Sequence, residues 1–124
     1  VIVSDHNPQD EESKRLTFAQ AATGASGVET LLPLALELFH NKKIEIKNLV
    51  ASITSNPSNI LGINKGNLDK GNDADLCVVD INKPWIVNKD NFKSKSKNTP
   101  IENRKLQGKV IKTFVKGELL YEGN

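Results

Sequence analysis

The chain has 124 residues, of which 37% are hydrophobic and 26% charged, and its formal net charge is +2. This length and composition are typical of one globular domain and exclude a disordered chain. No apolar run reaches the roughly 20 residues of a membrane-spanning helix, and no signal-peptide pattern opens the sequence, so we expect a soluble, cytoplasmic protein without membrane contact.

The chain opens on an apolar run from Val1 to Val3 that leads into Asp5 and Pro8. A continuous β-branched run favours a strand buried on both faces, as in a parallel sheet. Asp5 would then lie at the carboxyl end of the strand, where barrels of alternating strands and helices carry catalytic and metal-binding groups. The structural alternative is a carboxylate that stabilises the turn at Pro8.

A first helix is predicted to begin at Ser26, because Ser26 and Glu29 have the spacing of a capping box. Pro33 indicates either a kink or a later start near Thr30. We expect His40 to close the helix and to be exposed to solvent. The predicted core face has helical spacing and comprises Val28, Leu31, Leu32, Ala35, Leu38 and Phe39.

A second helix is predicted from the repeat of Ile46, Leu49, Val50 and Ile53, with its end near Ser55. Asn56-Pro57 indicates that a short helix follows, with Asn as its cap and Pro at its first position. Gly62 should end that helix.

After Gly62 the pattern alternates, and glycines or prolines interrupt it about every ten residues, which is typical of strands. The predicted strands cover residues 76–81, 85–87, 110–115 and 118–121, and Lys116-Gly117 predicts a tight hairpin turn. The single cysteine, Cys77, is expected to be a small buried hydrophobe. The chain thus divides into a βα part, residues 1–62, and a β-rich part, residues 63–124.

Residues 83–116 hold ten Lys and Arg against two acids, an excess of eight positive charges. The basic stretch from Phe92 to Thr99 is predicted to be a solvated loop. A nucleic-acid site is not expected, because aromatic residues that could stack on bases are scarce and no basic helical face is present.

Five stretches, in this order, resemble the C-terminal portion of the dihydroorotases, which are members of the amidohydrolase superfamily. The last stretch, with its Ser-Lys-Ser-x-Asn-Thr-Pro pattern, is the most specific to that family. The stretches are Ser4 to Pro8, Gly24 to Thr30 with Leu-Pro-Leu following, Asn56-Pro57 with Leu61-Gly62, Gly66 to Leu76, and Lys93 to Pro100.

The resemblance implies an α/β fold: the last part of a (β/α)₈ barrel in residues 1–62, with Val1 to Ser4 as the eighth strand, and most of a small composite β-domain in residues 63–124. It implies one or two zinc ions and the reversible hydrolysis of dihydroorotate to N-carbamoyl-aspartate, run towards ring closure in pyrimidine biosynthesis. Asp5 matches the family's strand-end Asp, which contacts the metal and acts as the base.

The substrate contacts carry over in part. Gln9 stands where the family usually has a His that holds the substrate carboxylate, and an uncharged amide donates a weaker hydrogen bond. Thr23-Gly24 stands where the family has Phe-Gly, whose backbone groups face the pyrimidine ring. Gln9, Thr23 and Gly24 are therefore the substrate-binding candidates.

With His6 and His40 as its only histidines, the chain has no counterpart of the family's other zinc ligands, and a zinc site normally takes at least three protein ligands. We therefore expect these 124 residues alone to be inactive and to be part of a working dihydroorotase.

Two alternatives stay open. One is a non-catalytic, dihydroorotase-like subunit that scaffolds aspartate transcarbamoylase; Gln9 and Thr23 favour it and Asp5 argues against it. Another cyclic amidohydrolase, a hydantoinase or allantoinase, fits the Ser-Lys-Ser pattern less well. By itself, the chain is expected either to dimerise through the apolar stripe of its first helix or to begin with a segment that lacks fixed structure.

Overall fold

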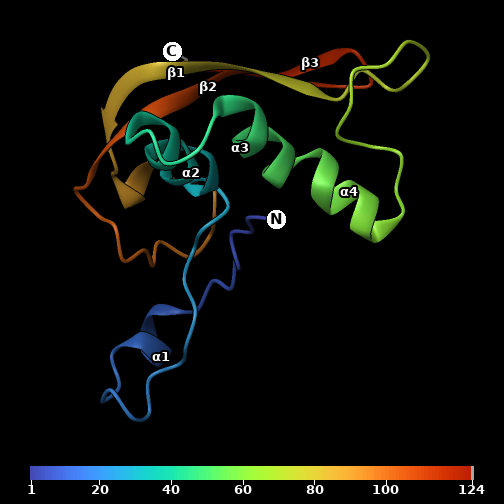
Figure 1. Ribbon diagram of the computed structural model, residues 1–124. Coiled ribbons are helices and arrows are strands. Elements are labelled where there is room, and N and C mark those ends of the chain that lie inside the picture. The colour runs from blue at the N-terminus through green and yellow to red at the C-terminus, as the bar shows by residue number, and fades with distance from the viewer. Residues whose placement is uncertain (124) are drawn as a thin grey trace.

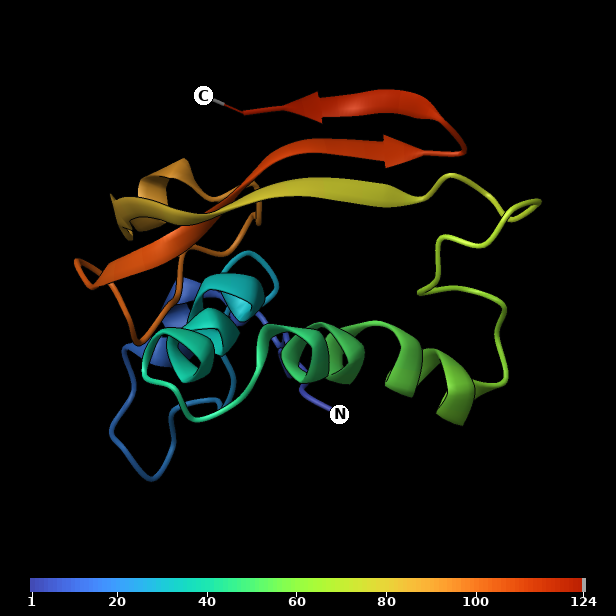
Figure 2. The same ribbon diagram turned by 45° about the horizontal axis from the view of Figure 1, so that its top comes forward.

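The computed structural model describes residues 1–123 and confirms a mixed α/β architecture (Figure 1). An antiparallel three-stranded sheet has the order β1-β2-β3. Figure 2 shows α2 and α3 beneath one face of this sheet. The elements are α1 (Glu11–Lys14), α2 (Leu31–His40), α3 (Ile46–Ile53), α4 (Ser55–Leu61), β1 (Leu76–Ile86), the 3-10 helix η1 (Lys89–Asn91), β2 (Lys105–Val115) and β3 (Glu118–Glu122).

The sheet is more continuous than the sequence predicts. The two strands expected over 76–81 and 85–87 form one strand, β1, with a register shift between Asp80 and Pro84. Asp80 Oδ1 accepts from the amides of Asn82 at 3.0 Å and Lys83 at 3.1 Å, so the bulged backbone still has partners. β2 likewise begins at Lys105, five residues before the predicted start.

The predicted hairpin is confirmed. Lys116 and Gly117, between β2 and β3, have positive φ angles of 50° and 82°. A two-residue turn with positive φ at both positions matches the twist of the strands that it joins.

Helix α2 begins later than a capping box at Ser26 predicts. Its N-cap is Thr30, so the alternative of a later start is correct. Pro33 is the third helical residue, where a backbone N–H would have no partner inside the helix. The proline therefore fits without a kink, and Glu29 is free for another role.

The core lies between α2, α3 and the sheet, and part of the predicted α2 stripe contributes to it: Ala35 is 4% exposed, and Leu32 and Phe39 pack against the core. Leu36 and Leu49 are 1% and 0% exposed, and Ile81 of β1 packs against them. Leu36 was not in the predicted stripe, whereas Val28 and Leu38 of that stripe are 56% and 41% exposed. The correction has a physical cause: a side chain on Gly108 of β2, where φ is 103°, would collide with Leu36.

The other short helices differ in detail from expectation. The second predicted helix is confirmed as α3, but α4 begins at Ser55, with Thr54 as N-cap, so Asn56 is not the cap and Pro57 is the third helical residue. Gly62 ends α4 in the left-handed conformation, as predicted. The one-turn helix α1 has no counterpart among the predicted elements; the Asp10 carboxylate accepts from Ser13 N at 2.7 Å and starts it.

Two expectations about single side chains were wrong. His40 is half-buried, with Nε2 at 2.9 Å from the carbonyl oxygen of Ile81, because α2 ends against β1. Cys77 is exposed, as is its neighbour Val78, so neither face of β1 is covered at this end of the strand.

The opening segment is not a strand in the structure. Val1 and Val3 are 62% and 69% exposed, and Ile2 N donates to the Ser52 carbonyl at the end of α3. A parallel strand needs a neighbour to complete its ladder. Within residues 1–123 no strand lies alongside Val1 to Ser4.

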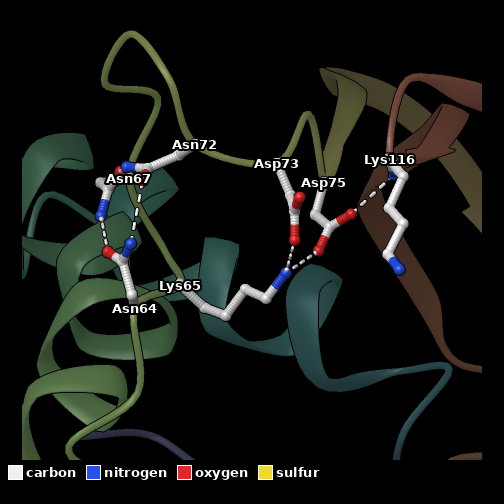
Figure 3. A network of polar contacts seen from close by, with 7 residues as sticks. All are labelled: Asn64, Lys65, Asn67, Asn72, Asp73, Asp75 and Lys116. Atoms are coloured by element: carbon white, nitrogen blue, oxygen red, sulfur yellow. Dashed lines mark hydrogen bonds and ion pairs between the residues drawn. The ribbon is translucent and has the colours of Figure 1, made fainter.

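The loop that joins α4 to β1 is held by a polar network (Figure 3). Lys65 Nζ lies 2.8 Å from an oxygen of Asp73 and 2.5 Å from one of Asp75, and the second Asp75 oxygen accepts from Lys116 N at 2.8 Å. The loop is thereby tied to the β2-β3 hairpin. Among the described residues, no helix is long and apolar enough to span a bilayer.

We predict that Leu36→Ala lowers the free energy of unfolding by about 2–5 kcal/mol, because a cavity is left between α2 and β2. Leu38→Ala is the matched control, since the same change on an exposed side chain of the same helix should cost under about 1 kcal/mol. Urea unfolding of both variants measures the difference. Equal losses would contradict the assignment of the core face.

The pKa of Asp75 lies below its ordinary value of 3.8, first because Lys65 donates to its side chain and then because Lys116 N does. A lowered pKa in the folded state stabilises the fold above the unfolded value, and this stability is lost as the pH falls below about 3.8 through the folded value. Asp75→Asn should therefore be less stable than wild type at neutral pH, with the gap closing below about pH 3.8. Urea midpoints across this range test it; a constant gap would contradict the role of the ion pair.

Candidate functional site

Two segments that are far apart in sequence lie side by side: the strand-end segment, residues 5–9, and the glycine segment, residues 23–28. His6 and Ala25 form a parallel bridge, and Asn7 N donates to the Ala25 carbonyl at 3.0 Å. The predicted residues Asp5 and Gln9 come from the first segment, and Thr23 and Gly24 from the second. The structure therefore brings the two predicted pairs into neighbouring positions.

Asp5 is exposed and has a φ angle of 45°. For a residue with a side chain this left-handed backbone is uncommon, and such strain collects at functional sites. Within residues 1–123 its carboxylate has no hydrogen bond or ion pair, whereas Asp10 caps a helix. The turn-stabilising alternative for Asp5 therefore finds no support, and its carboxylate is available for chemistry.

His6, which is not among the predicted site residues, joins the two segments. Its Nδ1 accepts from Gly27 N at 3.1 Å and from Val28 N at 3.3 Å. An imidazole nitrogen that accepts carries no proton, so the ring proton is on Nε2. His6 thus fixes the backbone next to Asp5.

Asn7 connects the substrate-binding candidates. Its Nδ2 donates to the Thr23 carbonyl at 3.3 Å, and its Oδ1 accepts from Gln9 Nε2 at 3.0 Å. Gly24 has a φ angle of 117°, and a side chain there would collide with Asn7. Only glycine suits this position.

A third segment, the Ser-Lys loop of residues 93–98, contacts both of the other segments. The expectation of a fully solvated loop is thereby corrected. Its lysines are exposed, but Ser94, Ser96 and Asn98 are half-buried. The two oxygens of Glu29 accept from the amides of residues 93 and 94 at 2.9 and 3.0 Å. Glu29 therefore anchors this loop and does not close a capping box.

The predicted site residues line two hollows. Asp5 and Gly24 line an open groove of about 710 Å³ that is bounded by α2 and Pro100. Gln9 lines an open cleft of about 1030 Å³ together with His6, Ser96 and Asn98. Thr23 lines neither of these two hollows, so its side chain gains no support as a substrate contact.

The residues present do not fit a complete metal centre. Within residues 1–123, no group of three or more His, Cys, Asp and Glu side chains could hold an ion. His6 directs its Nδ1 at two backbone amides and cannot also offer it to a metal beside Asp5. The Asp5 carboxylate alone does not make a metal site within these residues.

Comparisons with known proteins identify the family of the chain. Residues 1–120 match the amidohydrolase family. The chain is 43% identical to the dihydroorotase of Wolbachia sp. subsp. Drosophila simulans over 97% of its length, and 43% identical to that of Acetivibrio thermocellus, again over 97%. It spans only 27% and 28% of these two proteins, about a quarter of each.

Solved structures share the fold of the chain. The L-hydantoinase of Arthrobacter aurescens superposes with a TM-score of 0.78 at 33% identity, over 84% of this chain and 24% of that one. The dihydropyrimidinase of Brevibacillus agri has a TM-score of 0.88 at 21% identity, over 95% and 27%, which supports the fold alone.

The resemblance to dihydroorotases in the sequence is thus confirmed, and the fold agrees with it. From the family match over nearly its whole length, the chain belongs to the amidohydrolase family.

Proposed function

We propose that these residues form part of a dihydroorotase, a hydrolase that opens the cyclic amide of dihydroorotate to N-carbamoyl-aspartate and closes it again in pyrimidine biosynthesis. The observation that carries the proposal is the exposed, unpartnered Asp5 beside Gly24, in a chain that is 43% identical to dihydroorotases. In this proposal residues 1–62 belong to a (β/α)₈ barrel, with Val1 to Ser4 as a barrel strand, and residues 63–124 to a β-rich domain.

Asp5 supplies the proton transfer. It accepts a proton from water as the oxygen attacks the ring carbonyl, and it returns that proton to the ring nitrogen as the C–N bond breaks. Zinc, when bound, lowers the pKa of water towards neutrality. Residues 1–123 do not hold the ion by themselves, so further ligands must come from outside them.

The substrate lies against Gln9 and the glycine segment. Gln9 can donate from Nε2 to the substrate carboxylate, after exchanging its present partner, Asn7 Oδ1. The hydrogen bond is neutral on the donor side and so weaker than one from a charged His. The peptide groups around Thr23 and Gly24 face the ring.

A second candidate is hydantoin hydrolysis, which is favoured by the 33% identity to an L-hydantoinase of known structure. Both rings contain a cyclic amide, but dihydroorotate also carries a carboxylate. The ratio of kcat/KM values for dihydroorotate and hydantoin distinguishes the two functions, and the first proposal requires dihydroorotate to be preferred.

We predict that Asp5→Asn in the complete gene product lowers kcat by about 10²–10⁴-fold, because the amide cannot accept the proton. Asp69→Asn is the control, since Asp69 is an exposed acid in the loop before β1. Steady-state assays in both directions measure the effect. An Asp5→Asn enzyme with wild-type kcat would exclude Asp5 as the base.

The isolated 124-residue chain should neither hydrolyse dihydroorotate nor keep zinc through dialysis, because Asp5 has no companion ligands within residues 1–123. Metal analysis after dialysis, together with a turnover assay, tests this. Stoichiometric zinc would show that the chain builds a metal site of its own.

The complete gene product decides between enzyme and scaffold. Zinc retention and turnover support the enzyme. A metal-free, inert protein that co-purifies with aspartate transcarbamoylase would instead support the non-catalytic subunit.

A further inference from the structure

The Ser-Lys loop forms hydrogen bonds with both segments of the candidate site. Ser96 Oγ donates to the Gln9 carbonyl at 2.6 Å, and Asn98 Nδ2 donates to the Gly24 carbonyl at 3.0 Å. The donors are 87 and 74 residues away from their acceptors in the chain. Two of the residues that the proposed function assigns to substrate binding thus have their backbone fixed by this loop.

Asn98 is itself held in place. Its carbonyl accepts from Ser26 N at 2.8 Å, and the Ser26 hydroxyl donates to the Ser96 carbonyl at 2.9 Å. Ser26 is only 4% exposed. Because Ser26 lies two residues after Gly24, the loop holds the glycine segment at two neighbouring points.

Gly24 is also closely packed against Asn7. The Asn7 carbonyl and side chain lie so near that no Cβ would fit. Gly24 therefore contacts both Asn7 and Asn98. Its φ of 117° is one of many conformations open to glycine, so without these contacts its peptide group would adopt others. A hydrogen bond to the carbonyl is what keeps such a peptide from turning.

We propose that Asn98 is a positioning residue whose side chain fixes the Gly24 peptide for substrate binding, while Ser96 does the same for Gln9. The inference rests on the proposed substrate role of Gly24 and Gln9. It gives a physical role to the Ser-Lys-Ser-x-Asn-Thr-Pro pattern, whose serines and asparagine are half-buried while its lysines are exposed.

The test uses the complete gene product with two substitutions at one position. Asn98→Ala removes the donor, and Asn98→Asp keeps the shape but places a carboxylate oxygen against the Gly24 carbonyl oxygen. We expect KM for dihydroorotate to rise about fivefold in the first variant and at least tenfold in the second, with kcat within about twofold of wild type. Lys93→Ala is the matched control, because the Lys93 side chain is exposed and only its backbone meets Glu29.

Hydrogen exchange, read by mass spectrometry on the peptide with residues 23–28, gives a second readout that needs no activity. Exchange should be faster in both Asn98 variants and unchanged in Lys93→Ala. Faster exchange with unchanged KM would reduce Asn98 to a structural role and overturn the inference, as would unchanged exchange.

Failure of the proposed function is distinguishable from failure of this inference. A wild-type gene product that does not turn over dihydroorotate overturns the function and, with it, the substrate role of Gly24. The exchange measurement then still decides whether Asn98 holds the glycine segment. An active wild type with Asn98 variants of normal KM overturns the inference alone.

Discussion

The contact on which the structure depends is the packing of Leu36 of α2 beneath Gly108 of β2. It joins α2 to the sheet, and Trp85 Nε1 donates to the Gly108 carbonyl at 3.0 Å, which holds β1 and β2 together at this point. Burial of one leucine contributes about 1.5–3 kcal/mol, a large share of a small domain's net stability. The space for it exists only because residue 108 is a glycine.

A second core cluster shares helix α2 with the first and supports the Ser-Lys loop of the candidate site. Val87, Phe92 and Leu106 are buried together, and Leu34 and Ile101 pack against them. Phe92 directly precedes the Ser-Lys loop, Ile101 follows its last residue by three positions, and Leu34 belongs to α2. The loop is therefore anchored by apolar contacts on both sides, which leaves its serines and asparagine free to hydrogen-bond the site segments.

The candidate site combines side chains that hold its backbone segments with an Asp5 carboxylate that has no partner within residues 1–123. The side chains of His6, Asn7, Ser96 and Asn98 each form a hydrogen bond with a backbone group, and these bonds define where the segments lie. Asp5 stands at the junction with a strained backbone and a carboxylate that this part of the chain leaves unpaired. Among acids with a structural role, Glu29 has both carboxylate oxygens engaged and Asp10 has one.

The sequence by itself determined what depends on neighbouring residues: the period of α3, the stop at Gly62, the hairpin at Lys116-Gly117, and the motifs that identify the family. Local backbone preference and spacing are enough for these features. Only the tertiary structure decided that α2 buries Leu36, that Glu29 serves a distant loop, and that Asn98 reaches Gly24. Such contacts join residues more than 60 positions apart, and the pairing of a donor with a distant acceptor leaves no periodic trace in a single sequence.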